Sequence, residues 1–412
     1  MGKTYRYETD IPESFTDFDP DKYAHEVREW VDQLVPSNAK VALSGSGGVD
    51  STTLAYALHP ILGSRLYVYF IDDGLRRIIG GRPEADVTAG MFGTFENFEV
   101  IHTADKVIPA LEGYSSGELK RQIMIDRYLE ASNRFLERLG ALFVLDGTIK
   151  ADIVTKKARK QLQHNLDLAY DVDKLEPLAS LFKPHVRRLG RYAGLPEEFV
   201  HKIPCPGPAM LLRVGGRFER DKLDVIKEAN DLFEQGIEEY MRAITGKPYE
   251  YDPDTGVREP FQYFAYTIDP AMHRFGSLEG KYSDIAGTAV ECLVTDTKAM
   301  FFDPAEEEQR RALYEPTLWI NAEKFPDYDV LWRIREEAEK DNYPRVVIQL
   351  SEGSGRYPII MKAVNSSDAM SALSMELPID MLQETAGELY DMGALKTGYE
   401  ISKKPPASIE LF

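Results

Sequence analysis

The stretch from Lys40 to Thr53 reads KVALSGSGGVDSTT, and the order of its residue types decides the fold. Residues 41–43 are apolar, as in a buried strand; serines and glycines follow, and an apolar helical run covers residues 54–58. Glycines let successive N–H groups point into one concavity, and a helix N-terminus adds partial positive charge there. A strand, a Gly/Ser turn and a helix in this order therefore predict a phosphate-binding site.

Asp50 is the unusual member of this loop, because a carboxylate repels phosphate unless a cation lies between them. Magnesium prefers oxygen ligands and would explain the carboxylate, while Ser46 and Ser51 can donate hydrogen bonds to phosphate oxygens. The loop is not the ATPase P-loop, which has Lys followed by Ser or Thr after its second glycine, where this chain has Val-Asp-Ser. The simpler alternative is a glycine-rich turn that only connects a strand to a helix.

The composition limits the classes of protein to consider. The chain has 412 residues, of which 43% are hydrophobic, enough for two domains with their own cores. The net charge of −19 argues against nucleic acid as the main partner. The two cysteines give neither a disulfide framework nor a zinc spacing, and no apolar run approaches membrane-spanning length. The start of the chain is unlike a signal peptide, so we expect a cytoplasmic protein without a membrane partner.

Apolar strands alternate with helices beyond the opening loop. We expect strands over residues 66–71, 98–102 and 142–145, and helices over residues 21–34 and about 128–139. This alternation predicts a parallel sheet that is covered on both faces. Ligands of such sheets bind at the carboxyl ends of the strands, where Asp72-Asp73-Gly74 and Asp146-Gly147-Thr148 stand beside the Ser46 loop.

Several segments together carry a family resemblance: SGGVDS (46–51), IDDGLRR (71–77), LDGTIKADIV (145–154), LEPLASLFKPHVRRLGRYAGLP (175–196), PCPGPAMLLRVGG (204–216), the weaker IIMKAVNSSDAMSA (359–372) and the tail ISKKPPASIELF (401–412). They resemble GMP synthetase, a member of the N-type ATP pyrophosphatase superfamily. The loop alone is typical of the superfamily, whereas the KPPASIE tail is similar to the substrate domain of GMP synthetase.

The resemblance implies an α/β fold, in which a doubly wound, parallel-sheet domain of the adenine-nucleotide α-hydrolase type precedes a smaller α+β domain. We expect an N-terminal helical segment at 1–37, the ATP-pyrophosphatase domain at 38–205, and a substrate-binding and dimerisation domain at 206–412. An insertion at about 247–342 has no counterpart in the family.

The resemblance also implies the chemistry. Such enzymes cleave ATP between the α- and β-phosphates, adenylate the carbonyl of a purine nucleotide (XMP in this family), and replace the AMP with ammonia. We expect ATP as co-substrate, Mg²⁺ as cofactor, and ammonia that is free or delivered by a separate glutaminase subunit. A homodimer is expected by resemblance.

The site residues that the resemblance implies fall into three groups. ATP and its pyrophosphate would contact Ser44, Ser46, Gly47, Gly48, Val49, Asp50, Ser51, Asp73, Gly74, Gly147 and Thr148. Asp50 and Lys160 would serve catalysis, and Asp50 and Asp152 would hold the metal. The acceptor would contact Pro206, Gly207, Arg213, Lys362, Lys404 and Glu410. The structural alternatives are a plain turn for Asp73-Gly74, a helix cap for Asp152 and a solvated helix face for Lys160.

The chain departs from the family mainly on the acceptor side. Lys362 stands where the family usually has Arg, and Lys lacks the planar fork of Arg. The lid segment reads Gln163-His164-Asn165 in place of paired histidines, and the tail ends in Leu411-Phe412. Cys205 takes the place of an aromatic residue, so its thiol is either a sulfur carrier or a small buried hydrophobe.

Three functions are therefore compared. The first is amination of an XMP-like carbonyl after its adenylation by ATP. The second uses the same adenylation for another acceptor or for sulfur transfer. The third is a nucleotide-binding protein without turnover, which the Asp within the phosphate loop argues against.

Overall fold

The structure is a computed structural model that describes residues 2–12, 14–158, 168–203, 205, 207–247, 261–302, 312–365 and 371–407. The chain forms two compact units. Unit 1 takes Met1–Ala110 and Gln122–Pro208, and unit 2 takes Leu111–Arg121, Ala209–Glu250 and Glu259–Phe412. The functional boundaries near residues 37 and 205 remain a proposal. Within the described ranges, no helix is long and apolar enough to cross a membrane.

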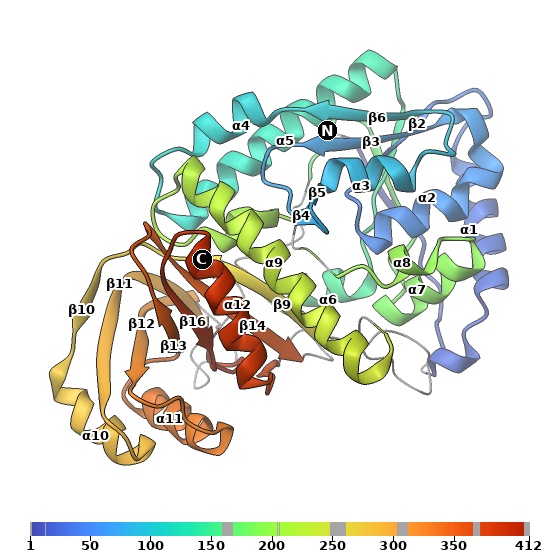
Figure 1. Ribbon diagram of the computed structural model, residues 1–412. Coiled ribbons are helices and arrows are strands. Elements are labelled where there is room, and N and C mark those ends of the chain that lie inside the picture. The colour runs from blue at the N-terminus through green and yellow to red at the C-terminus, as the bar shows by residue number, and fades with distance from the viewer. Residues whose placement is uncertain are drawn as a thin grey trace. The chain divides into compact units, whose positions relative to one another are not determined.

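Unit 1 is built on a six-stranded sheet whose strand order is β1-β8-β7-β2-β3-β6, with every neighbouring pair parallel. Figure 1 labels β2, β3 and β6 of this sheet. Its strands are β1 (Thr4–Arg6), β2 (Val41–Ser44), β3 (Leu66–Asp72), β6 (Phe98–His102), β7 (Phe143–Leu145) and β8 (Asp173–Glu176). A small hairpin, β4 (Ile78–Ile79) and β5 (Arg82–Pro83), follows β3. The predicted parallel α/β fold is confirmed.

Helices cover both faces of this sheet. They are α1 (Pro20–Leu34), α2 (Val49–Leu62), α3 (Glu84–Met91), α4 (Ala104–Leu111), α5 (Gly117–Leu139), α6 (Lys150–Ala158), α7 (Lys183–Tyr192) and α8 (Glu197–Val200), with short 3₁₀ turns η1 (Phe15–Asp17) and η2 (Gly63–Arg65). Val41 and Leu43 of β2 pack into the core formed with α1, α2 and α7, whereas Ala42 packs into the core formed with α5. The period of two in β2 thus gives each face its own core.

Unit 2 contains an eight-stranded mixed sheet in the order β10-β11-β12-β13-β16-β14-β15, with β9 pairing to β14. The strands are β9 (Phe261–Thr267), β10 (Met272–Arg274), β11 (Val290–Phe302), β12 (Ala312–Ala322), β13 (Val346–Glu352), β14 (Tyr357–Asn365), β15 (Leu373–Ser374) and β16 (Ala394–Glu400). The helices are α9 (Arg220–Thr245), α10 (Gly276–Ala286), α11 (Tyr328–Lys340) and α12 (Ile379–Asp391), and η3 (Ala209–Arg213) is a 3₁₀ turn. The described part of the insertion therefore adds strands and helices to the C-terminal sheet and does not form a separate body.

A buried charge cluster lies inside unit 2. The Glu400 carboxylate is fully buried and accepts hydrogen bonds from Arg345 at 2.7 and 2.8 Å, from the Tyr266 hydroxyl at 2.7 Å, and from the Lys362 ammonium. Burial lowers the pKa of Lys362 to about 8, although the attraction of Glu400 opposes this shift. Removal of one charge from such a cluster leaves the others buried without compensation.

We predict that Glu400→Gln destabilises unit 2 by about 3–5 kcal/mol, because two cations then lose their buried anion. Urea unfolding followed by the fluorescence of Trp319 and Trp332, both in unit 2, measures the loss. The matched control in the same unit is Asp224→Asn, which breaks an exposed ion pair with Arg220 and should change little. Equal stability of both variants would show that the cluster does not hold unit 2 together.

Candidate active site

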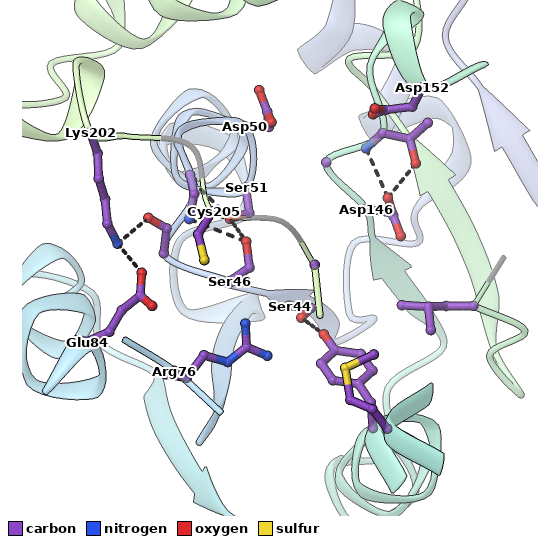
Figure 2. Close-up of a pocket in the computed structure, with 18 of the residues that line it drawn as sticks. Ser44, Ser46, Asp50, Ser51, Arg76, Glu84, Asp146, Asp152, Lys202 and Cys205 are labelled. Carbon is purple, nitrogen blue, oxygen red and sulfur yellow. Dashed lines mark hydrogen bonds and ion pairs between the residues drawn. The ribbon is translucent and has the colours of Figure 1, made fainter. Parts of the chain in front are cut away.

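A pocket of about 190 Å³ lies within unit 1 at the carboxyl ends of β2 and β7 (Figure 2). The loop after β2 forms one wall, and the turn after β7 forms another. This is the edge of the sheet that the sequence analysis expects to bind ligand. The residues of the two walls are Ser44, Ser46, Gly47, Gly48, Asp50, Ser51, Asp146, Gly147, Thr148 and Asp152.

The loop after β2 has the backbone geometry of an anion site. Gly47 adopts a positive φ of 73°, which glycine reaches at little cost, and Gly48 precedes the first residue of α2. The Ser46 and Ser51 hydroxyls share a hydrogen bond of 3.1 Å. Gly147 approaches so closely that a Cβ on it would lie 3.1 Å from the Ser51 nitrogen. The N-terminus of α2 therefore lies at the pocket wall, where its dipole favours an anion.

Two carboxylates face the pocket near this helix. Asp50 has one oxygen that is buried without a hydrogen-bond partner among the described residues. Burial, and next the charge of Asp50, raise the pKa of Asp152 to about 6, although a hydrogen bond from the Ile149 N–H opposes the shift. That bond is 2.9 Å long and spans from the residue before α6 to its third residue, so Asp152 also caps α6. In the described part of the chain, no cluster of three or more metal-ligating side chains occurs.

Lys183 is a candidate site residue that the sequence analysis missed. Its ammonium donates a hydrogen bond of 2.5 Å to the second oxygen of Asp50. It lies at the first position of α7, 133 residues further along the chain, within the quoted segment LEPLASLFKPHVRR. The sequence therefore showed the motif that contains Lys183, but it did not show that Lys183 contacts Asp50.

Arg76, Glu84 and Lys202 also line the pocket and were missed. Arg76 donates to Asp73 at 3.0 Å, and its guanidinium lies 5.7 Å from the centre of the Phe70 ring. Lys202 donates to Glu84 at 2.7 Å. Because each cation is held by a carboxylate, the wall carries positive groups in fixed positions.

The remaining wall is apolar and aromatic. Met124 and Tyr128 of α5 line it together with Leu168 and Tyr170. The Tyr128 hydroxyl is hydrogen-bonded to the Ser44 hydroxyl, and burial raises its pKa. An apolar and aromatic wall beside an anion site suits a purine ring linked to phosphates.

The other predicted site residues lie elsewhere. Asp73 and Gly74 are not among the lining residues: the Asp73 carboxylate accepts from the Leu75 N–H and from Arg76, and Gly74 has a φ of 79°. Val49 packs in the small core of Leu195 and Val200.

Predicted acceptor residues divide between the units. Gly207 lines the pocket, as does Cys205, which was not among the predicted acceptor residues. Arg213, Lys362 and Lys404 belong to unit 2; Arg213 lies 3.3 Å from the centre of the Phe264 ring, and Lys404 pairs its backbone with Ala372. Lys160, the 163–165 lid segment, Pro206 and Glu410 lie outside the described residues.

The chain is similar to known proteins over most of its length. Residues 344–411 match the GMP synthase C terminal domain. A subunit of the glutamine-hydrolyzing GMP synthase of Sulfurisphaera tokodaii is 30% identical over 403 residues, which cover 95% of this chain and 99% of that protein. The subunit of the same name from Methanopyrus kandleri is 32% identical over 257 residues, covering 61% of this chain and 77% of that protein. Among solved structures, the NH3-dependent NAD synthetase from Campylobacter jejuni has 18% identity and a TM-score of 0.36, covering 58% of this chain and 90% of that one.

We predict that Asp152→Asn stabilises the ligand-free protein, and more so at pH 7.5 than at pH 5. The raised pKa of Asp152 means that folding takes up a proton between about pH 4 and 6, so stability falls as the pH rises through this window. The gain in unfolding free energy should be about 1 kcal/mol larger at pH 7.5. Chemical unfolding at both pH values measures it, with the exposed Asp105→Asn as the control. A gain that does not change with pH would contradict the prediction.

Proposed function

The chain belongs to the GMP synthase family, and we propose that it cleaves ATP in the unit 1 pocket to adenylate and then aminate XMP. It is an AMP-forming C–N ligase of this family. The observation that carries the proposal is the Ser46–Ser51 loop at the N-terminus of α2, which places a carboxylate, hydroxyls and a helix dipole at one wall of a pocket.

The pocket offers a complementary surface to each part of ATP. Backbone N–H groups and the two serine hydroxyls of the loop would bind the pyrophosphate part. Lys183 and Arg76 would balance its negative charge. The wall of Met124, Tyr128, Leu168 and Tyr170 would receive the adenine ring.

The carboxylates fit a magnesium ion. Asp50 has a buried oxygen without a described partner, and Asp152 lies close enough for the charge of Asp50 to raise its pKa. Magnesium usually takes one or two protein carboxylates together with waters and phosphate oxygens, which agrees with this small number of ligands. When bound there, Mg²⁺ would offset the charge of the leaving pyrophosphate. The Lys183 ammonium is already on Asp50 and would help to hold that carboxylate in place.

The reaction needs no side-chain nucleophile. The purine O2 of XMP attacks the α-phosphorus, the bond to the bridging oxygen breaks, and pyrophosphate leaves into the loop. Ammonia then attacks C2 of the purine and loses its excess protons, while AMP leaves with the former O2. The protein therefore works by positioning and by electrostatic stabilisation.

The remaining predicted residues are part of the proposal. Lys160 would close on the pyrophosphate, and Asp73, Gly74 and Val49 would support the nucleotide site from outside the lining set. The acceptor would contact Pro206, Gly207, Arg213, Lys362, Lys404 and Glu410. For Lys362 the burial and the bond to Glu400 favour an indirect role.

The ammonia source and the assembly are also proposed. The relatives are named as one of the subunits of a glutamine-hydrolysing enzyme, so we propose a separate glutaminase subunit as the donor of ammonia. We propose a homodimer on the resemblance of the C-terminal domain to its family.

The assay that tests the function supplies MgATP, XMP and ammonium and follows pyrophosphate, AMP and GMP together. We expect the three products in equal amounts, with none formed when XMP is omitted. If pyrophosphate release depends on a different acceptor, that acceptor takes the place of XMP in the proposal. GMP formation without AMP would contradict the adenylation step.

We predict that Asp50→Asn lowers kcat about 10²-fold or more in this assay, because a neutral amide holds neither magnesium nor Lys183 as well. Thermal unfolding confirms that the variant is folded. Asp105→Asn, which neutralises an exposed carboxylate of α4, should retain activity. Equal activity of the two variants would show that Asp50 is not part of the catalytic site.

A further inference from the structure

We propose that Lys202 is a positioning residue that fixes the orientation of the Gly47–Gly48 peptide, with Glu84 holding Lys202 in place and Arg77 in turn holding Glu84. Figure 2 shows the Lys202 side chain reaching between Glu84 and the phosphate loop. Its ammonium donates to the Gly47 carbonyl at 2.9 Å and to Glu84 at 2.7 Å. The inference rests on the proposed function, because it concerns how the loop binds pyrophosphate.

The orientation of this peptide unit matters because its N–H group and its carbonyl group point in opposite directions. A loop that binds phosphate must present N–H groups to the anion and turn its carbonyl oxygens away, since a carbonyl oxygen repels phosphate. Gly47 has a positive φ and no side chain, so the backbone at this point has more accessible conformations than at other residues. The bond from Lys202 selects the conformation in which the Gly47 carbonyl is already engaged by a cation.

Lys202 is itself held firmly. The side chains of Lys202 and Glu84 are only 9% and 4% exposed. Burial alone would raise the pKa of Glu84, but Lys202 and then Arg77 overcome this effect and hold the pKa at about 2. Glu84 therefore stays charged at every pH at which the enzyme is expected to work, and it keeps the ammonium beside Gly47.

Arg77 extends this arrangement to a second wall of the pocket. Its guanidinium lies 3.8 Å from the Glu84 carboxylate and donates to the Ile203 carbonyl at 2.9 Å. Ile203, Cys205 and Gly207 also line the pocket, and Lys202 directly precedes them in the chain. The three side chains thus join the phosphate loop to the segment that the family resemblance assigns to the acceptor.

A purely structural role would give the same contacts, so the test needs a matched control. Lys174 and Glu176 on β8 form a similar pair in unit 1: their charged atoms are 2.8 Å apart, and the side chains are 10% and 2% exposed. Neither residue lines the pocket. Lys174→Met therefore removes a comparably buried lysine without touching the phosphate loop.

The experiment compares Lys202→Met, Lys202→Arg and Lys174→Met. For each variant, the KM values for ATP and XMP, the inhibition constant of pyrophosphate and the melting temperature are measured. We expect Lys202→Met to raise the KM for ATP and the inhibition constant of pyrophosphate about tenfold, as expected for a lost charge-assisted hydrogen bond. The KM for XMP should change by less than about twofold, and Lys202→Arg should recover most of the loss because a guanidinium can donate to both oxygens.

Lys174→Met should lower the melting temperature about as much as Lys202→Met does. It should leave the KM for ATP and the inhibition constant of pyrophosphate unchanged. The proposal is wrong if Lys202→Met keeps normal constants, or if Lys174→Met raises them equally. If Lys202→Met does not fold, Glu84→Gln takes its place, with an expected rise of about threefold in the same constants. Titration with ATP and with pyrophosphate distinguishes failure of the proposed function from failure of the role of Lys202. If the wild-type protein binds neither ligand, the proposed function fails. If the wild type and Lys202→Met bind both ligands equally well, only the role of Lys202 is overturned.

Discussion

The parallel pairing of β2 between β7 and β3 is the constraint on which the site depends. Leu43 pairs with Leu145 on one side and with Val68 on the other, so the three strands end at the same edge of the sheet. This register brings the Ser46 loop beside Asp146-Gly147-Thr148, although about a hundred residues separate them in the chain. A shift of one residue would also exchange the two faces of β2 and destroy both cores.

Paired charges then prepare this edge for an anion. Lys183 is bonded to Asp50, Lys202 to Glu84 and Arg76 to Asp73. Each carboxylate reduces the cost of burying its cation and fixes its position, while the loop supplies N–H donors and hydroxyls. A site that is organised before the ligand arrives needs little rearrangement during the reaction, which is the main source of electrostatic catalysis.

The sequence predicted the fold and the two pocket walls formed by the loop after β2 and the turn after β7, because a strand, a turn and a helix are each encoded by neighbouring residues. It did not reveal Lys183, Lys202 or Tyr128, since each becomes a site residue only through a partner far away in the chain. Asp73 does not line the pocket but orients Arg76, which does, and its predicted role in binding ATP stays a prediction. The sequence did not predict where the insertion lies in the fold, because its strand β12 pairs with β13 by hydrogen bonds that no local pattern reveals.

The central claim is that ATP is opened at its α-phosphorus by the carbonyl oxygen of XMP. The most direct measurement uses XMP labelled with ¹⁸O at the purine O2, together with MgATP and ammonium, and determines the mass of the AMP formed. The account predicts one ¹⁸O atom in the phosphate of each AMP and none in pyrophosphate. Unlabelled AMP, with the label retained on the purine or released to water, would contradict it.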